Sequence, residues 1–308
     1  MSLPYLGPKD LRSVLSMKKA IDALDDAFSG ELPTVPPRSH LGVGKGDLLV
    51  MPAWDGALGV GVKLVTVAPD NPSAGLPLIH GVYVLFDYES LSPSALLDGA
   101  ALTGIRTAAV SAVATRYLAR ADSKSLLVFG GGTQGLAHIE AMRDVLPGLE
   151  RVLCVSRSRP SAERLVERAT ELGYRAQVAS VDAVEQADVV CTCTTASSAL
   201  FDGALLRPGT HINAVGAYKP DARELDDATI ARSKVFVEAK ESALREAGDI
   251  RIPIESGVLA PSDVTELGDV ADGRLAGRTD LDDVTVFKSV GVAFEDLVVA
   301  AAAVKRST

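Results

Sequence analysis

The chain has 308 residues, 47% of them hydrophobic and 23% charged, which is enough for a sizeable core in one large or two ordinary domains. Its formal net charge is −9, and no basic stretch offsets repulsion from phosphates, so we expect no nucleic-acid partner. No apolar run approaches the roughly 18 residues of a membrane span, and the first residues lack a signal-peptide pattern. We therefore expect no membrane partner and a cytoplasmic location.

The first part of the chain is predicted to contain two kinds of element. Apolar residues at helical spacing over 10–28 indicate amphipathic helices, with Ser16 as an N-cap within the stretch. Residues 47–66 and 78–88 cluster Val, Leu, Ile and Tyr between Pro and Gly, which is typical of strands in a sheet. The Ala-rich stretch 100–120 predicts a longer helix.

From residue 122 onward, short apolar runs alternate with helical stretches. Helices are predicted over 133–146 and 160–172, a last helix over 292–305, and strands over 125–130, 151–156, 188–193, 211–216, 234–239 and 285–291. Continuous apolar strands separated by helices favour a parallel sheet covered on both faces. The predicted fold class is therefore α/β, a doubly wound Rossmann-type parallel sheet preceded by an N-terminal α/β domain.

The three cysteines, Cys154, Cys191 and Cys193, form an odd and sparse set, as expected of reduced thiols in the cytoplasm. Cys191 and Cys193 would share one face of a strand. A metal site would need further ligands, and the sequence offers none nearby. We expect buried thiols and no metal site.

A glycine motif follows the strand predicted to end near residue 130. The run Gly130-Gly131-Gly132-Thr133-Gln134-Gly135 has the spacing G-x-G-x-x-G between an apolar strand and a helix. Its glycines permit a tight turn, close approach of a pyrophosphate and close helix–strand packing, and the helix N-terminus attracts phosphates. The alternative is a glycine-rich turn without a ligand. We predict a dinucleotide site that includes Gly130, Gly132, Thr133, Gln134 and Gly135.

The end of the next strand selects the nucleotide. An acidic residue there would bind the ribose 2′-hydroxyl of NADH, but this sequence has Ser156, Arg157, Ser158 and Arg159. Arg157 can pair with a 2′-phosphate, and the serines can donate hydrogen bonds to it. A solvated basic loop is the alternative. We predict NADPH as the preferred cofactor and NADH as the other possibility.

Segments over nearly the whole chain resemble the ornithine cyclodeaminase/mu-crystallin family. They are VMPAWDG (50–56), VGVKLV (60–65), ALTGIRTAAVSAVATRYLAR (101–120), GGGTQ (130–134), HINAVGAYKPDARELD (211–226) and VFKSVGVAFEDLVVA (286–300). The resemblance implies a substrate-binding domain of residues 1–121 plus 292–308, which forms a homodimer, and an NAD(P)-binding domain of residues 122–291. Members include ornithine cyclodeaminases, ketimine and cyclic-imine reductases, alanine dehydrogenases and opine-type enzymes.

The resemblance also implies three catalytic residues. Arg38 and Arg106 match arginines that hold the substrate carboxylate, and Lys63 matches a lysine close to the substrate. Two guanidinium groups fix a carboxylate well, and a lysine held among cations has a lowered pKa that suits proton transfer. Each of the three could instead be a surface charge. Arg106 lies in an apparently buried helix, where a ligand carboxylate would supply the partner that a buried arginine needs.

Further residues complete the predicted site. We assign Thr192, Val215, Ser289 and Gly291 to the cofactor; the last two lie in the segment 288–291, which matches the family segment near the nicotinamide. Met51, His80 and Tyr218 are assigned to the substrate pocket, although His80 could equally be a core histidine. Glu295 and Asp296 are expected to be structural rather than catalytic.

Two positions depart from the pattern of true ornithine cyclodeaminases, which the resemblance implies carry acidic residues there. These positions are Leu49 and Tyr218. A leucine and a tyrosine do not supply the anionic surroundings that an ammonium group requires. The segment AYKPD (217–221), which contains Tyr218, is more similar to the mu-crystallins than to the ornithine cyclodeaminases of the family.

The leading hypothesis is an NAD(P)H-dependent enzyme that reduces the C=N bond of a small cyclic imino acid. Its substrate would be Δ1-pyrroline-2-carboxylate or Δ1-piperideine-2-carboxylate, held by Arg38 and Arg106, with Lys63 or a water it orients supplying the proton. The second hypothesis is an amino-acid dehydrogenase of the alanine dehydrogenase type. Ornithine cyclodeaminase activity and a non-catalytic NADPH- or ligand-binding protein remain as further alternatives.

Overall fold

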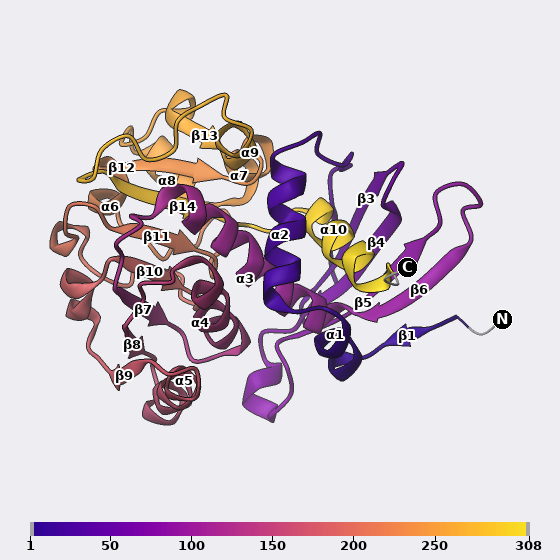
Figure 1. Ribbon diagram of the computed structural model, residues 1–308, viewed down its shortest axis with the longest axis horizontal. Coiled ribbons are helices and arrows are strands. Elements are labelled where there is room, and N and C mark those ends of the chain that lie inside the picture. The colour runs from indigo at the N-terminus through magenta and orange to yellow at the C-terminus, as the bar shows by residue number, and fades with distance from the viewer. Residues whose placement is uncertain (1–2, 306–308) are drawn as a thin grey trace. The chain divides into compact units, whose positions relative to one another are not determined.

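The computed structural model describes residues 3–305, which fold as two compact units (Figure 1). One unit runs to Arg106 and resumes at Val292, and the other is Thr107–Gly291. The boundary between the two units at Arg106 falls inside helix α3 (Gly99–Leu118). The sequence predicted this boundary beyond that helix, after residue 121. Among residues 3–305, no helix is long and apolar enough to cross a membrane.

The first unit contains a six-stranded sheet. Its strands are β1 (Tyr5–Leu6), β2 (Ser39–Gly42), β3 (Asp47–Asp55), β4 (Gly59–Val67), β5 (Ile79–Phe86) and β6 (Pro93–Asp98), in the order β1-β6-β5-β4-β3-β2. The pair β1–β6 is parallel, and the other pairs are antiparallel. Buried and partly exposed residues alternate along β3 and β4, so one face of the sheet is a core face.

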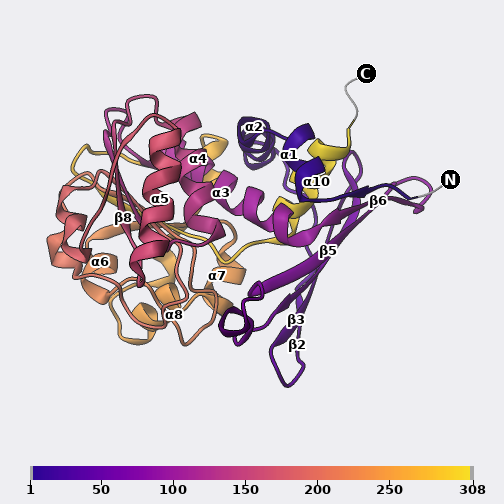
Figure 2. The ribbon, with the colours of Figure 1, turned by 90° about the horizontal axis from the view of Figure 1, so that it is seen from below.

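Helices pack on that core face (Figure 2). The unit contains α1 (Pro8–Val14), α2 (Met17–Phe28), the short 3-10 helix η1 (Asn71–Ala74) and α10 (Ala293–Val304), and α10 contacts α2, β3 and β4. Ser16 caps α2, as predicted, by accepting a hydrogen bond from the amide of Lys19. Helix α10 is buried along almost its whole length, and the ring of Phe294 meets Phe28 edge to face with centroids 5.2 Å apart. The C-terminal helix therefore belongs to the core of the first unit.

The second unit contains an eight-stranded parallel sheet. Its strands are β7 (Ser125–Phe129), β8 (Arg151–Val155), β9 (Arg175–Val178), β10 (Val189–Thr192), β11 (His211–Ala214), β12 (Ser233–Val237), β13 (Val264–Glu266) and β14 (Val284–Lys288), in the order β13-β12-β14-β11-β10-β7-β8-β9. The chain moves to β8 and β9 on one side of β7 and to β10 and β11 on the other. The switch in strand order therefore lies between β7 and β10, where α/β folds bind ligands at the carboxyl ends of the strands.

Helices cover both faces of this sheet. They are α4 (Thr133–Val145), α5 (Arg159–Glu171), α6 (Asp227–Ala231), α7 (Lys240–Glu246), α8 (Gly248–Glu255) and α9 (Leu267–Ala271), with short 3-10 helices η2 (Val181–Gln186), η3 (Gly203–Leu205) and η4 (Pro261–Asp263). In Figure 2, α4 and α5 lie on one side of the sheet and α6 and α8 on the other. The predicted Rossmann-type parallel sheet is confirmed.

Candidate functional site

A row of side chains crosses the core face of the first sheet. Met51 on β3, Lys63 on β4 and Tyr83 on β5 occupy paired positions in the strand register. Directly opposed residues of antiparallel strands point to the same face. Lys63 is only 1% exposed, which excludes a surface charge, and Met51 and Tyr83 are also buried.

Lys63 is paired with a carboxylate from the C-terminal helix. Its Nζ lies 2.7 Å from Oδ2 of Asp296, which is itself fully buried on α10. The pKa of Lys63 is lowered to about 8: burial is the largest cause, the positive charge of Arg106 adds to it, and the negative charge of Asp296 opposes both. We expected neighbouring cations to be the main cause, but burial is the larger one. At this pKa the amine can give up a proton near neutral pH.

Arg106 lies on α3 in the same cluster and is 6% exposed. Its Nη1 is 2.9 Å from Oε2 of Glu295, and its Nε is 3.3 Å from Oδ1 of Asp296. The buried arginine therefore has protein carboxylates as partners, whereas the sequence led us to expect a ligand carboxylate in that role. Asp296 links Lys63 and Arg106.

Two acidic residues on α10 contact the predicted catalytic residues. Glu295 and Asp296 are expected to be structural rather than catalytic, and their carboxylates pair with Arg106 and Lys63. The sequence carried a signal for these contacts, because two adjacent carboxylates occur in an otherwise apolar helix, and buried carboxylates need cationic partners.

Tyr83 completes the cluster on the core face. Its hydroxyl lies above Gly61 on β4, where a Cβ atom would be only 1.8 Å away, so the glycine makes room for the ring. Burial, and then the charge of Asp296, raise the pKa of Tyr83 well above its usual value. Among residues 3–305 the buried hydroxyl has no hydrogen-bond partner. The phenol is therefore held in its neutral form opposite Lys63 in the strand register.

The other residues predicted for the first unit lie at its margins. Arg38 is half-buried directly before β2. Because Ser39 pairs with Val50, continuing that register by one residue puts Arg38 opposite Met51, at the end of the buried row. His80 is exposed on β5, so the alternative of a core histidine was wrong.

The glycine motif of the second unit forms the predicted turn between β7 and α4. Gly130 has a φ of 104°, and a Cβ there would be 2.3 Å from the carbonyl oxygen of Cys193. A Cβ on Gly135 would be 2.0 Å from the carbonyl oxygen of Gly130, whereas one on Gly132 would meet nothing within 4 Å. Thr133 and Gln134 open the 13-residue helix α4, whose first amides have no partners within the helix. This open helix N-terminus fits the phosphates of a dinucleotide.

The loop after β8 carries the residues predicted to select the nucleotide. Arg157 is exposed, and Ser156 is half-buried. Ser158 caps α5, since its side chain accepts from the amide of Ser161 and donates to the Ser161 hydroxyl at 2.9 Å. Its hydroxyl is therefore already engaged, which we did not expect of a phosphate ligand.

A buried carboxylate connects two loops at the carboxyl edge of the sheet. Glu224 accepts hydrogen bonds from the Thr192 hydroxyl at 2.8 Å, from the Thr194 amide at 2.9 Å and from the Gly216 amide at 2.7 Å. The amide of Val215 donates to the carbonyl of Thr192 at 3.0 Å. Thr192 and Val215, both predicted cofactor residues, are thus held side by side. Glu224 itself was missed, because its partners lie on different strands.

A second buried carboxylate holds the loop after β14. Glu238 accepts from the Ser289 hydroxyl, and the amides of Val290 and Gly291 donate to it at 3.0 and 3.2 Å. Gly291 has a φ of 77°, which a side chain rarely adopts. The predicted residues Ser289 and Gly291 are therefore brought to the same edge of the sheet as the glycine motif.

The remaining expectations concern the second unit. Tyr218 is half-buried in the loop after β11, with the Lys219 ammonium 5.9 Å from its ring centroid.

All three cysteines are free thiols: Cys154 and Cys191 are buried on strands, whereas Cys193 lies just beyond β10 and is only partly buried. Within residues 3–305, no three His, Cys, Asp or Glu side chains gather in a geometry that could hold a metal ion.

Comparisons with known proteins agree with this arrangement. The sequence matches the model of the ornithine cyclodeaminase/mu-crystallin family over residues 8–307. It is 38% identical over 310 residues to a Δ1-pyrroline-2-carboxylate reductase of Bacillus cereus, covering 96% of this chain and 94% of that protein. A Δ1-pyrroline-2-carboxylate reductase of Paracoccus denitrificans is 37% identical over 304 residues, with the same coverages.

Solved structures of similar fold include enzymes of the same kinds. The Δ1-pyrroline-2-carboxylate reductase of Thermococcus litoralis, in complex with NADH and L-proline, superposes with a TM-score of 0.95 at 35% identity, covering 98% of this chain and 97% of that one. An archaeal alanine dehydrogenase dimer with bound NAD superposes with a TM-score of 0.92 at 31% identity, covering 99% and 96%.

Proposed function

Because the chain belongs to the ornithine cyclodeaminase/mu-crystallin family, we propose that it is an NAD(P)H-dependent reductase of a small cyclic imino acid, Δ1-pyrroline-2-carboxylate first. The observation that carries the proposal is the buried cluster of Lys63, Arg106 and Asp296, in which the lysine pKa is lowered to about 8. Reduction of a C=N bond needs a proton at nitrogen, and an amine with this pKa can supply one near neutral pH.

The second unit supplies the cofactor residues. Gly130, Gly132, Thr133, Gln134 and Gly135 would hold the pyrophosphate, with Thr192, Val215, Ser289 and Gly291 at the same edge of the sheet. The bound nicotinamide supplies the hydride that reduces the imine carbon. Glu224 and Glu238 fix the loops that carry these residues, so the backbone is organised before the cofactor binds.

The first unit supplies the chemistry at nitrogen. In this proposal Lys63 donates a proton to the imine nitrogen, directly or through a water molecule, while Arg106 and Arg38 hold the substrate carboxylate. Asp296 positions Lys63 and keeps its charged form accessible despite burial. Met51 borders Lys63 in the buried row, and His80 and Tyr218 remain proposed pocket residues.

The test is an absorbance assay of NADPH and NADH oxidation with Δ1-pyrroline-2-carboxylate and Δ1-piperideine-2-carboxylate. We expect rapid oxidation that Lys63→Gln lowers by at least about a hundredfold, the usual contribution of a positioned acid. Lys9→Gln, which removes an exposed charge on α1, is the matched control, and melting temperatures verify folding. Absence of turnover with both imines, or equal loss in the two variants, would refute the proposal.

A second candidate is an amino-acid dehydrogenase. An alanine dehydrogenase of Archaeoglobus fulgidus is 32% identical over 306 residues, and the same carboxylate-binding residues would serve an open-chain substrate. Pyruvate with ammonia distinguishes the two: oxidation of reduced cofactor that requires ammonia favours the dehydrogenase. Ammonia-independent turnover of the cyclic imines favours the reductase.

We propose NADPH as the preferred cofactor, on the strength of Arg157 and the absence of an acidic residue after β8. Arg157→Ala should raise KM for NADPH by about tenfold or more while leaving KM for NADH nearly unchanged, because only the former carries a 2′-phosphate. Arg143→Ala, an exposed arginine on α4, serves as the control. Equal kcat/KM of the unmodified enzyme with both cofactors would refute the preference.

We further propose that the protein is a cytoplasmic homodimer. Three free thiols favour a reducing compartment. The outer face of the first sheet carries partly exposed apolar residues in register, including Val50, Leu64 and Val82, where an antiparallel sheet usually presents polar residues to water. The alanine dehydrogenase of similar fold is a dimer, which supports the same assembly here.

A further inference from the structure

A polar pocket of about 440 Å³ opens on the second unit, at the amino ends of its strands. Ser125, Arg151 and Arg175 are the first residues of β7, β8 and β9, and all three line it. The glycine motif follows the carboxyl end of β7, at the opposite edge of the parallel sheet. The pocket is therefore separate from the dinucleotide site, and its volume is typical of small-molecule sites.

The pocket concentrates positive charge on an acidic protein. Among its lining residues are four cations, Lys124, Arg151, Arg175 and Arg207, and two carboxylates, Glu150 and Asp188, which leaves an excess of two positive charges. The whole chain has a formal net charge of −9. A local excess of the opposite sign attracts anions to this point on the surface.

Three of the four cations have carboxylate partners. Arg175 lies 2.7 Å and Lys124 3.3 Å from Glu150, and Arg207 lies 2.8 Å from Asp188. These pairs place the three cations at the rim of the pocket in the structure. Because all three cationic side chains are substantially exposed, their ion pairs are weak and can rearrange around a ligand.

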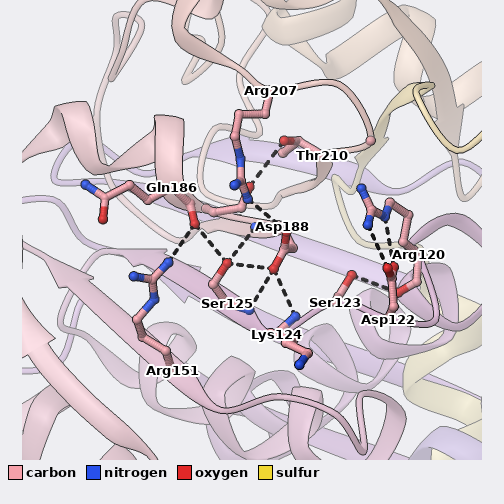
Figure 3. Close-up of polar contacts among 12 residues, drawn as sticks. Arg120, Asp122, Ser123, Lys124, Ser125, Arg151, Gln186, Asp188, Arg207 and Thr210 are labelled. Atoms are coloured by element: carbon pink, nitrogen blue, oxygen red, sulfur yellow. Dashed lines mark hydrogen bonds and ion pairs between the residues drawn. The ribbon is translucent and has the colours of Figure 1, made fainter.

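Arg151 is different. Its guanidinium donates from Nη2 to the carbonyl oxygen of Gln186 at 3.0 Å, as Figure 3 shows. Throughout the described chain, residues 3–305, no carboxylate lies within ion-pair distance of it. The carbonyl orients the side chain, and the planar guanidinium retains donors that suit a carboxylate or phosphate oxygen.

The floor of the pocket is organised by hydrogen bonds. Oδ2 of Asp188 accepts from the amides of Lys124 and Ser125, each at 2.9 Å, and from the Ser125 hydroxyl at 2.7 Å (Figure 3). The same hydroxyl is 2.9 Å from the carbonyl oxygen of Gln186, the group that orients Arg151. The strand ends and the cation are thus fixed relative to one another, which lowers the entropic cost of binding.

We propose that this pocket binds a small molecule with two anionic groups, phosphates or carboxylates, which engage Arg151 and the cations beside it. The site is distinct from the imine and dinucleotide sites and independent of the proposed reduction. Two anionic groups match the excess of two positive charges, and the pocket volume accommodates a metabolite of this class.

The test is calorimetric titration of the whole protein at low ionic strength with inorganic pyrophosphate and, separately, with citrate. Saturating NADH keeps pyrophosphate out of the dinucleotide site. We expect saturable binding of at least one probe to a single site per chain, weakened about tenfold or more by Arg151→Gln. Tighter binding of pyrophosphate would indicate a phosphate ligand, and tighter binding of citrate would indicate a carboxylate ligand.

Arg232→Gln is the matched control, because that exposed arginine also donates to backbone carbonyls of the second unit but does not line the pocket. It should leave the Kd unchanged within about twofold. Arg175→Gln, which alters a side chain that is 78% exposed, gives a second variant should Arg151→Gln lower the melting temperature. No saturable binding of either probe, or equal weakening by Arg232→Gln, would overturn the proposal.

Discussion

Asp296 connects the charge of Lys63 to that of Arg106. The family resemblance points to both cations from the sequence, but the carboxylate that pairs with them comes from a helix more than 180 residues later. Its effect on the lysine is opposite to that of burial, since a nearby anion stabilises the ammonium form. In the proposed mechanism Asp296 is therefore a positioning residue whose charge tunes the pKa of Lys63.

Asp296→Asn should shift the pH dependence of imine reduction. In the unmodified enzyme, kcat/KM should fall as pH rises through about 8, because Lys63 must be protonated to donate. Removing the anion lowers the pKa of Lys63 further, so the decline should begin at lower pH, by about one unit or more. The measurement is the pH profile of kcat/KM in the reductive direction.

Glu295→Gln is the control for this prediction. It removes a carboxylate of α10 that pairs with Arg106 rather than with Lys63, and its effect on the pKa of Lys63 is smaller. The decline should therefore move less than in Asp296→Asn. An unchanged profile in Asp296→Asn, with folding intact, would mean that Lys63 is not the titrating proton donor.

Among the elements, strongly periodic or apolar segments could be predicted from the sequence and short exposed ones could not. Helix α2, strands β3 to β5 and strands β7, β8, β10 and β11 all bury a regular set of apolar residues, so their patterns are visible in the sequence. Strands β2 and β9 are almost entirely exposed and lack such a pattern. Pairing with a neighbouring strand makes them strands, and a single sequence does not record that pairing.

The glycine turn before α4 allows a prediction that separates folding from binding. Gly135→Ala should lower the melting temperature, because its Cβ would be 2.0 Å from a backbone oxygen, and such overpacking costs about 1–3 kcal/mol. Gly132→Ala should keep the melting temperature, because its Cβ meets nothing, but should weaken NADH binding where the backbone must approach the pyrophosphate.

Thermal unfolding and fluorescence titration with NADH test the pair. Each variant serves as the control of the other, since both add one methyl group to the same turn. Wild-type affinity for NADH in Gly132→Ala would argue against a pyrophosphate at this helix end.

At the scale of the whole molecule, the outer face of the first sheet predicts an assembly. Leu64→Glu should convert the proposed dimer to monomers, because it places a charge in the centre of an apolar interface. Val14→Glu makes a similar change at an exposed apolar residue of α1, and that variant should remain dimeric. Light scattering coupled to size-exclusion chromatography measures the mass. A monomeric unmodified protein, or a dimeric Leu64→Glu protein, would contradict this prediction.

The sequence by itself determined the Rossmann-type unit and the glycine motif, because each depends on local pattern and spacing, and the resemblance of its segments to a known family pointed to the lysine and arginine of the first unit. Only the tertiary structure decided which groups neutralise Lys63 and Arg106, how Glu224 and Glu238 organise the loops at the carboxyl edge, and where positive charge gathers at the amino edge. The physical reason is that buried charges and loop amides pair with groups that are far away in the sequence. One sequence alone does not show which of these distant groups are in contact.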